Sequence, residues 1–202
     1  MTLDQLIELI RGQIRDNQEP FTFAKKTEEQ PDELEMFVEQ ALIDYSRWKP
    51  IEEKPGAINL QAGTVLYDLP SDFMEMKSFP VNVTCQVLGQ QLLLIDVPET
   101  AMQIPYTYKA AHSAESVPLT DKVCIAWFAA AQALRAITSD TKKLDSYVSY
   151  NLKDVLQVDA KESNRVVTIL KENAASLEEK YKERVMYPAE QHASGAAFMT
   201  FG

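Results

Sequence analysis

Hydrophobic residues recur at helical spacing along the first quarter of the chain. One apolar stripe predicts a helix over residues 3–15, and Thr2 with Gln5 has the spacing of a capping box at its start. A second stripe predicts a helix that Pro31 and Asp32 open and that ends near residue 49. The intervening residues 16–30 are predicted to be a loop with two phenylalanine anchors, or a short strand. The stripe positions are Leu3, Leu6, Ile7, Ile10, Ile14 in the first helix and Leu34, Phe37, Val38, Ala41, Leu42, Tyr45, Trp48 in the second.

After Pro50 the period changes from helical spacing to alternation. Residues 50–56 are polar and contain two prolines, which favours a boundary between modules. Residues 58–62 then alternate, Gly63 predicts a turn, and residues 64–69 are expected to run back beside them as a hairpin.

Two further alternating segments and a last strand complete the predicted strand module. Residues 81–87 and 91–97 predict a hairpin with Gly89 at its tip. Residues 104–108 predict a last strand, which Pro105 should place at the edge of its sheet because proline cannot donate a ladder hydrogen bond.

A short motif ends the strand at 64–69. We call it the corner motif, and its residues fall within seven positions of the chain: Tyr67, Leu69, Pro70, Asp72 and Phe73. Pro70 ends the strand, Asp72 offers side-chain oxygens for a turn, and Phe73 is an apolar anchor. Taken alone, the motif indicates a strand-to-turn corner of the kind found in many mixed domains.

Helical periodicity returns at residue 120 and continues to residue 186. It predicts a buried, alanine-rich helix that begins at Thr120 or Asp121, a linker over 139–143, a second helix with its apolar side over 144–155, and a long helix over 162–186. The narrow stripe of the long helix comprises Val166, Leu170, Ala174, Leu177, Tyr181 and Val185.

These elements predict an α+β fold. Two N-terminal helices (residues 1–50) and about three C-terminal helices (117–186) form a helical bundle, a small antiparallel β module (51–116) is inserted between them, and residues 187–202 form an extended tail.

Charge and cysteine content narrow the classes of function. The chain has 202 residues and a formal net charge of −10, which disfavours tight binding to nucleic acid phosphates. Cys85 and Cys124 are too few for a disulfide framework and indicate free thiols in a reducing compartment. No basic segment precedes the first apolar residues as in a secretory signal, and the longest apolar run is too short for a bilayer.

The sequence predicts no catalytic, metal-binding or cofactor-binding residue. His112 and His192 have no second ligand at metal-binding spacing, and the glycines form no phosphate-binding loop. Asp68 and Asp72 are the one carboxylate pair that an enzyme could use, although turn hydrogen bonding is their simpler role.

Apolar residues also lie in the predicted tail. Phe198, Met199 and Phe201 follow a run of small residues, so they either fold back on their own subunit or become ordered on a partner. Tyr187 and Pro188 are expected to end the long helix before this tail.

The order of these parts resembles the head-to-tail adaptor, or connector, proteins of tailed bacteriophages. The resemblance covers roughly residues 3–186, and its most specific piece is the corner motif after an alternating strand with Ala62 and Gly63. Tyr106 and Tyr108 also resemble the family's tyrosine-rich strand, although Ala110 and Ala111 stand where the family has a proline.

The resemblance implies a mechanical function without a cofactor. It implies a homo-oligomeric ring, twelvefold in its expected form, in the neck of the virion, which assembles in the host cytoplasm. The portal protein would bind the tail of the chain, and the docking residues would be Tyr187, Pro188, Phe198, Met199 and Phe201. A tail or stopper (nozzle) protein would bind below. DNA would pass through an acidic lumen without sequence-specific binding, and no membrane is implied as a partner. The alternatives are a tail-completion or stopper-type protein, a non-phage cytosolic enzyme that uses Asp68 and Asp72, and an unrelated cytosolic scaffold.

Overall fold

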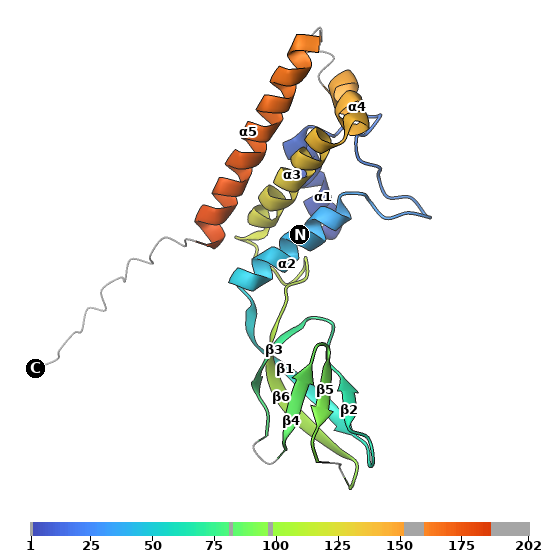
Figure 1. Cartoon of the computed structure of the whole chain (residues 1–202), viewed down its shortest axis with the longest axis vertical. Coiled ribbons are helices and arrows are strands. Elements are labelled where there is room, and N and C mark those ends of the chain that lie inside the picture. The colour runs from blue at the N-terminus through green and yellow to red at the C-terminus, as the bar shows by residue number, and fades with distance from the viewer. Residues whose placement is uncertain (1, 81–82, 97–98, 152–159, 187–202) are drawn as a thin grey trace, which may run out of the picture. The chain divides into compact units, whose positions relative to one another are not determined.

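The structure, a computed structural model, describes residues 2–80, 83–96, 99–151 and 160–186. The chain has an α+β fold, with five helices and two three-stranded antiparallel sheets in these ranges, which confirms the predicted fold class (Figure 1). It divides into two compact units: a helical unit of Met1–Ala41 with Ala114–Gly202, and a strand unit of Leu42–Ser113. The helices are α1 (Leu3–Ile14), α2 (Glu35–Trp48), α3 (Lys122–Ser139), α4 (Thr141–Asn151) and α5 (Ala160–Val185).

The start of α1 follows its sequence signal. The Thr2 hydroxyl accepts a hydrogen bond from the Gln5 backbone N–H at 3.3 Å, and the Gln5 side chain accepts one from the Thr2 N–H at 2.9 Å. This capping box satisfies two donors that the first turn of a helix leaves without partners. Arg15 ends the helix in the left-handed conformation, with φ 60°. The predicted first helix is confirmed.

Helix α2 begins later than the sequence predicted. We expected it to open at Pro31 and Asp32, whereas its first helical residue is Glu35. The Asp32 carboxylate accepts a hydrogen bond from the Leu34 N–H at 2.9 Å, and the Asp32 N–H donates to the Glu35 carboxylate at 3.3 Å. Asp32 therefore caps the helix and is not part of it.

Helix α3 is the centre of the helical unit, as its alanine-rich sequence predicted. Helices α1, α4 and α5 all pack against it (Figure 1). Five of the six stripe residues of α5 are buried, and Leu177 is half-buried. The predicted linker over 139–143 is wrong, because Asp140 alone separates α3 from α4 and its carboxylate accepts from the Lys142 N–H at 2.8 Å. Residues 152–155 of the predicted second helix lie outside the described residues.

The strand unit contains two sheets with one hydrophobic core between them. The first sheet has the order β1 (Ile51–Leu60), β6 (Met102–Ala110), β3 (Phe73–Ser78), and the second has the order β2 (Leu66–Asp68), β5 (Gln91–Leu94), β4 (Cys85–Leu88). Inward side chains of both sheets belong to a single buried cluster. Its buried members are Ile58, Leu60, Leu69, Phe73, Leu92, Leu94, Ile104, Tyr106, Tyr108 and Ala110.

The predicted pairing of the first hairpin is wrong. Residues 58–62 were expected to pair with 64–69, but β1 pairs with β6 and β2 pairs with β5. Gly63 does form a turn, with φ +78°. Alternation shows which face of a strand is buried, but not which strand lies beside it, so the long-range pairing was not visible. The second hairpin is confirmed in a shorter form as β4 and β5, whereas β3 was missed.

Two prolines lie within strands, Pro55 in β1 and Pro105 in β6 (Met102–Ala110). The strand module was expected to begin at residue 51, and β1 does begin at Ile51; as an edge strand it tolerates Pro55, so the residues from 51 to 56 are strand. Pro105 was expected to mark an edge strand, yet β6 is the central strand of its sheet. The ladder between β3 and β6 ends at Thr107, so Pro105 lies where β6 pairs with β1 alone.

Gly56 permits a close contact in this sheet. A Cβ atom at this position would lie 2.4 Å from Cζ of Tyr106, so the tyrosine ring lies directly over the glycine backbone. Tyr106 is nearly fully buried and belongs to the core. The glycine thus provides the space that the ring occupies.

Within the described part of the chain, none of the helices combines the length and hydropathy that crossing a membrane requires.

Candidate functional site

The corner motif connects the two sheets of the strand unit. The Tyr67 hydroxyl donates to the Thr64 carbonyl at 2.9 Å and accepts from the Gln61 N–H at 3.0 Å, so it closes the turn that precedes β2. The Leu69 side chain is buried, and its N–H donates to the Gln90 carbonyl at 2.9 Å. The first half of the motif thereby joins the turn at residues 61–64 to the β4–β5 hairpin.

The second half of the motif turns the chain into β3. The Phe73 N–H donates to the Pro70 carbonyl at 2.9 Å, which closes a tight turn. The Phe73 ring is buried and stacks on Tyr108 of β6, with ring centroids 5.6 Å apart and an interplanar angle of 27°. The motif therefore places two buried side chains, Leu69 and Phe73, on either side of a proline turn.

Asp72 lies in that turn and organises a polar cluster, which we call the Asp72 cluster (Asp72, Lys54 and Tyr108). Its carboxylate forms an ion pair with Lys54 of β1 and accepts a hydrogen bond from the Tyr108 hydroxyl of β6 at 3.1 Å. Its backbone carbonyl accepts from the Ala111 N–H at 2.7 Å. The hydrogen bond to Asp72 raises the pKa of Lys54, and burial together with the Asp72 carboxylate raises the pKa of Tyr108.

The second carboxylate near the motif has a different partner. Asp68 accepts a hydrogen bond from the Gln91 side-chain amide across the β2–β5 pair at 2.9 Å. An acid–base pair would need Asp68 and Asp72 to act on one group, whereas their contacts tie Asp68 to a hairpin and Asp72 to the other sheet. Both sets of contacts serve the turn and sheet structure.

A second polar cluster, in the helical unit, was missed by the sequence reasoning. The Arg11 side chain is fully buried and forms ion pairs with Asp16 at 2.9 Å and Asp32 at 2.8 Å. It also donates to the carbonyls of Phe23 at 3.1 Å and Ala24 at 3.4 Å. We call Arg11, Asp16 and Asp32 the Arg11 cluster. It ties the loop between α1 and α2 to α1 at several points.

The two carboxylates of this cluster receive additional donors. Asp16 accepts from the backbone N–H groups of Thr22 at 2.6 Å and Phe23 at 3.1 Å, while Asp32 accepts from the Leu34 N–H. Buried charges need such partners, because desolvation is otherwise costly. The available signal was Arg11 itself, since it follows Ile10 within the apolar stripe of the first helix, where a charge requires a buried counter-ion.

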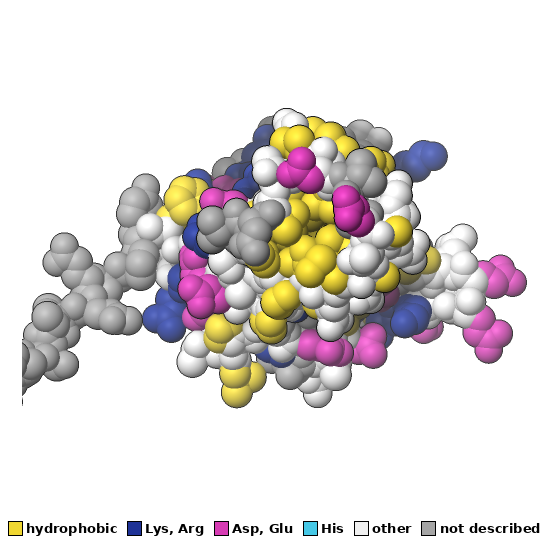
Figure 2. Space-filling view, turned by 90° about the horizontal axis from the view of Figure 1, so that it is seen from below, with side chains coloured by type: hydrophobic (Ala, Val, Ile, Leu, Met, Phe, Trp, Pro, Cys, Tyr) yellow, Lys and Arg dark blue, Asp and Glu magenta, His cyan; other side chains and the backbone are white. Residues whose placement is uncertain are grey.

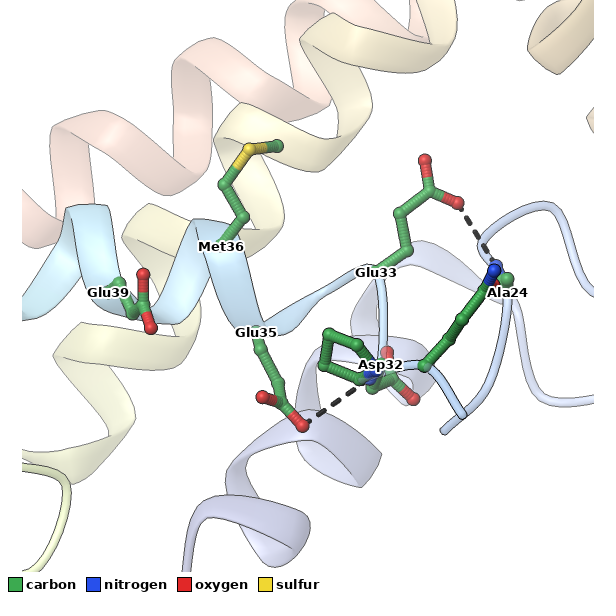
Figure 3. Close-up of a pocket in the computed structure, with 8 residues that line it drawn as sticks. Ala24, Asp32, Glu33, Glu35, Met36 and Glu39 are labelled. Carbon is green, nitrogen blue, oxygen red and sulfur yellow. Dashed lines mark hydrogen bonds between the residues drawn. The ribbon is translucent and has the colours of Figure 1, made fainter. Parts of the chain in front are cut away.

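An open pocket of about 470 Å³ lies next to Asp32 in the helical unit (Figure 3). The Glu33 carboxylate accepts from the Ala24 N–H at 3.1 Å and forms an ion pair with Lys143. No group of three or more His, Cys, Asp or Glu side chains in the described ranges is arranged to hold a metal ion. The pocket is lined by Ala24, Gln30, Pro31, Asp32, Glu33, Glu35, Met36 and Glu39.

The other residues considered as functional candidates either have contacts within the fold or lie outside the described residues. The His112 N–H donates to the Ser46 hydroxyl at 2.8 Å, and its ring packs edge-on against Tyr45 at 5.3 Å. Cys124 is buried in α3. His192 and the docking residues lie outside the described residues, so their predicted role stays a prediction. These docking residues are Tyr187, Pro188, Phe198, Met199 and Phe201.

In comparisons with known proteins, no family model matches the chain, and no curated protein matches it significantly.

Proposed function

We propose that the protein is a structural head-to-tail adaptor of a tailed bacteriophage. The observation that carries the proposal is the order of its parts. Both ends of the chain contribute helices to one unit, and the residues between them form a separate strand unit. The corner motif lies within that strand unit and connects its sheets. This is the arrangement that the resemblance to the adaptor family implies.

In this proposal the subunit assembles into a ring, twelvefold in its expected form, beneath the portal protein in the neck of the virion. The tail of the chain, residues 187–202, binds the portal protein, and the strand unit faces neighbouring subunits and a tail or stopper protein. The net charge of −10 then has a physical role, because an acidic channel repels DNA phosphates and allows the duplex to pass.

The clusters described above fit a mechanical role. The Arg11 cluster and the Asp72 cluster each use their charges to hold a loop or a turn against regular structure. A subunit that transmits load between a capsid and a tail requires connections of this kind, which do not depend on a bound substrate.

The tail provides the most direct test. We compare the full chain with a deletion of residues 189–202 and with a triple variant, Phe198→Ser, Met199→Ser and Phe201→Ser. Both altered proteins should keep the far-ultraviolet circular dichroism and melting temperature of the full chain, but should not attach to DNA-filled heads. Leu119→Ser is the matched control, because it replaces an apolar side chain by serine at a described position outside the tail, where the side chain is 75% exposed.

Attachment is measured by sedimentation of filled heads with bound adaptor. Normal attachment of the deletion variant would contradict the docking role of the tail. Failure of the full chain to bind any filled head or purified portal protein would contradict the proposed function itself.

A further inference from the structure

The two outward faces of the strand unit differ in character. The outward face of the sheet β1–β6–β3 is charged, with Lys109 3.3 Å from Glu75 and 3.7 Å from Glu52, and Lys77 3.6 Å from Glu52. Such pairs are typical of a sheet face in contact with water.

The outward face of the other sheet carries exposed aliphatic side chains beside Gln86, Gln91 and Asp68. Leu66 of β2 lies directly opposite Leu93 of β5, and Leu88 of β4 lies opposite Gln91, one row along the same face. Ile95 continues this face beyond the end of β5, where its N–H donates to the Thr84 carbonyl at 2.9 Å. We call these four side chains (Leu66, Leu88, Leu93 and Ile95) the Leu93 face.

The Leu93 face is open to solvent in the isolated chain. Leu66 is 43% exposed, Leu88 46% and Ile95 60%, while Leu93 is half-buried. The alternate residues of β5, Leu92 and Leu94, are buried in the core, so the aliphatic side chains outside are additional to those that the fold needs. Exposed aliphatic side chains that gather on an outward sheet face and have polar neighbours are typical of a surface that a partner covers. Figure 2, a view of the molecule from below, shows hydrophobic side chains beside acidic ones on the surface seen from that side.

Charge indicates which kind of partner fits. Between Pro55 and Tyr108 the chain contains one basic residue, Lys77, and no histidine. Lys77 belongs to the other sheet, in β3, and pairs with Glu52. Asp68 lies on the same face, opposite Gln91, and Asp96 follows Ile95 in the chain. A nucleic acid or an anionic membrane would be repelled, and two copies docked through this same face would bring like charges together.

We infer that the Leu93 face docks a protein surface that is apolar at its centre and carries lysine or arginine side chains around it. The inference concerns this surface alone and does not rest on the proposed function. If that function holds, the partner is a component that meets the strand unit, and it is distinct from the portal protein that binds the tail of the chain.

Two amphipathic peptides of defined sequence are the probes. Both carry leucine at the same helical positions, and their polar positions are lysine in one and glutamate in the other. Each is titrated into the full-length protein by isothermal calorimetry, and amide chemical shifts are followed by NMR. The lysine peptide should bind, with shifts centred on Leu66, Leu88, Leu93 and Ile95, and the glutamate peptide should not.

Matched variants distinguish binding of the lysine peptide at the Leu93 face from binding caused by the overall negative charge of the protein. The double variant Leu66→Ser, Leu88→Ser should bind the lysine peptide about tenfold more weakly, whereas Ile169→Ser, which alters a side chain 42% exposed on α5, should not change the affinity. Melting temperatures show that each variant is folded. Asp68→Asn with Asp96→Asn should weaken binding and reduce its dependence on salt.

Three outcomes would overturn the inference: equal binding of both peptides, unchanged affinity of the double variant, or concentration-dependent self-association of the wild-type protein that the double variant abolishes. The last outcome would assign the face to a second copy of the chain. Because none of these measurements uses heads or portal protein, this inference and the proposed function can fail separately.

Discussion

The Arg11 cluster and the Asp72 cluster solve the same structural problem under different degrees of solvent exposure. Each uses charge to attach a loop or a turn to regular structure. Arg11 and Asp16 are fully buried, and Asp32 is 6% exposed. In the Asp72 cluster, the side chains of Lys54 and Asp72 are 43% and 27% exposed. Since water screens the second cluster and not the first, the two should respond differently to mutation and to pH.

The largest expected effect follows from removing the buried arginine. Arg11→Met leaves two carboxylates, Asp16 and Asp32, buried without their counter-ion. Loss of one partner from a buried ion pair typically costs about 3–5 kcal/mol. The free energy of unfolding, measured by urea denaturation, should fall by about that amount. The control is Lys25→Met, which breaks the exposed Lys25–Glu8 pair at 3.3 Å and should cost less than about 1 kcal/mol. Equal losses in both variants would remove the distinction between buried and exposed ion pairs.

An intermediate effect is expected where the backbone and a core ring touch. Gly56→Ala places a methyl group 2.4 Å from the buried Tyr106 ring, which cannot move without disturbing the core. Overpacking of this kind costs about 1–3 kcal/mol. Gly12→Ala in α1 is the matched control, because a Cβ there meets nothing within 4 Å. It should stabilise the protein by up to about 1 kcal/mol, since alanine favours the helix. An unchanged melting temperature for Gly56→Ala would show that the Tyr106 ring is not held as described.

The smallest expected effect is the change of stability with pH that the Asp72 cluster causes. The pKa values of Lys54 and Tyr108 are raised above their ordinary values of 10.5 and 10.0. A raised pKa in the folded state means that the folded protein retains protons that the unfolded chain releases. The resulting stabilisation is therefore present below pH 10.0 and is lost as pH rises through the raised values.

The pH response is measured as the unfolding free energy from pH 8 to pH 11 by chemical denaturation. The wild-type protein should lose stability above about pH 10, and Tyr108→Phe should lose less over the same range because it lacks one of the titrating groups. Tyr108→Phe should also cost about 1 kcal/mol at neutral pH through the lost hydrogen bond to Asp72. An identical alkaline response in both proteins would contradict this account of the cluster.

The hydrophobic periodicity predicted the helices well, because a helix places residues three or four positions apart in the chain on the same buried face. The stripes of α1, α3 and α5 face buried surfaces, and the Thr2–Gln5 capping box formed as its spacing indicated. The start of α2 was misplaced, because the sequence alone did not show that Asp32 is bound to Arg11 and caps the helix.

The strand unit was harder to predict, because its determinants are distant in the sequence. Ile58 pairs with Ile104 and Tyr67 with Leu92, and no local signal specifies those partners. Proline proved ambiguous, since Pro105 is tolerated in a central strand where one neighbouring ladder has ended. The contacts of the corner motif follow from the same pairing, which is why sequence reasoning found a turn at Asp72 but not its partners Lys54 and Tyr108.

We propose that this chain is a subunit of a channel-forming ring in the neck of a phage. Electron microscopy of the purified protein mixed with purified portal protein tests it most directly. We expect rings with a central channel stacked coaxially on the portal, and a complex that is lost when residues 189–202 are deleted. A protein that stays monomeric or dimeric at high concentration in the presence of portal protein would contradict it.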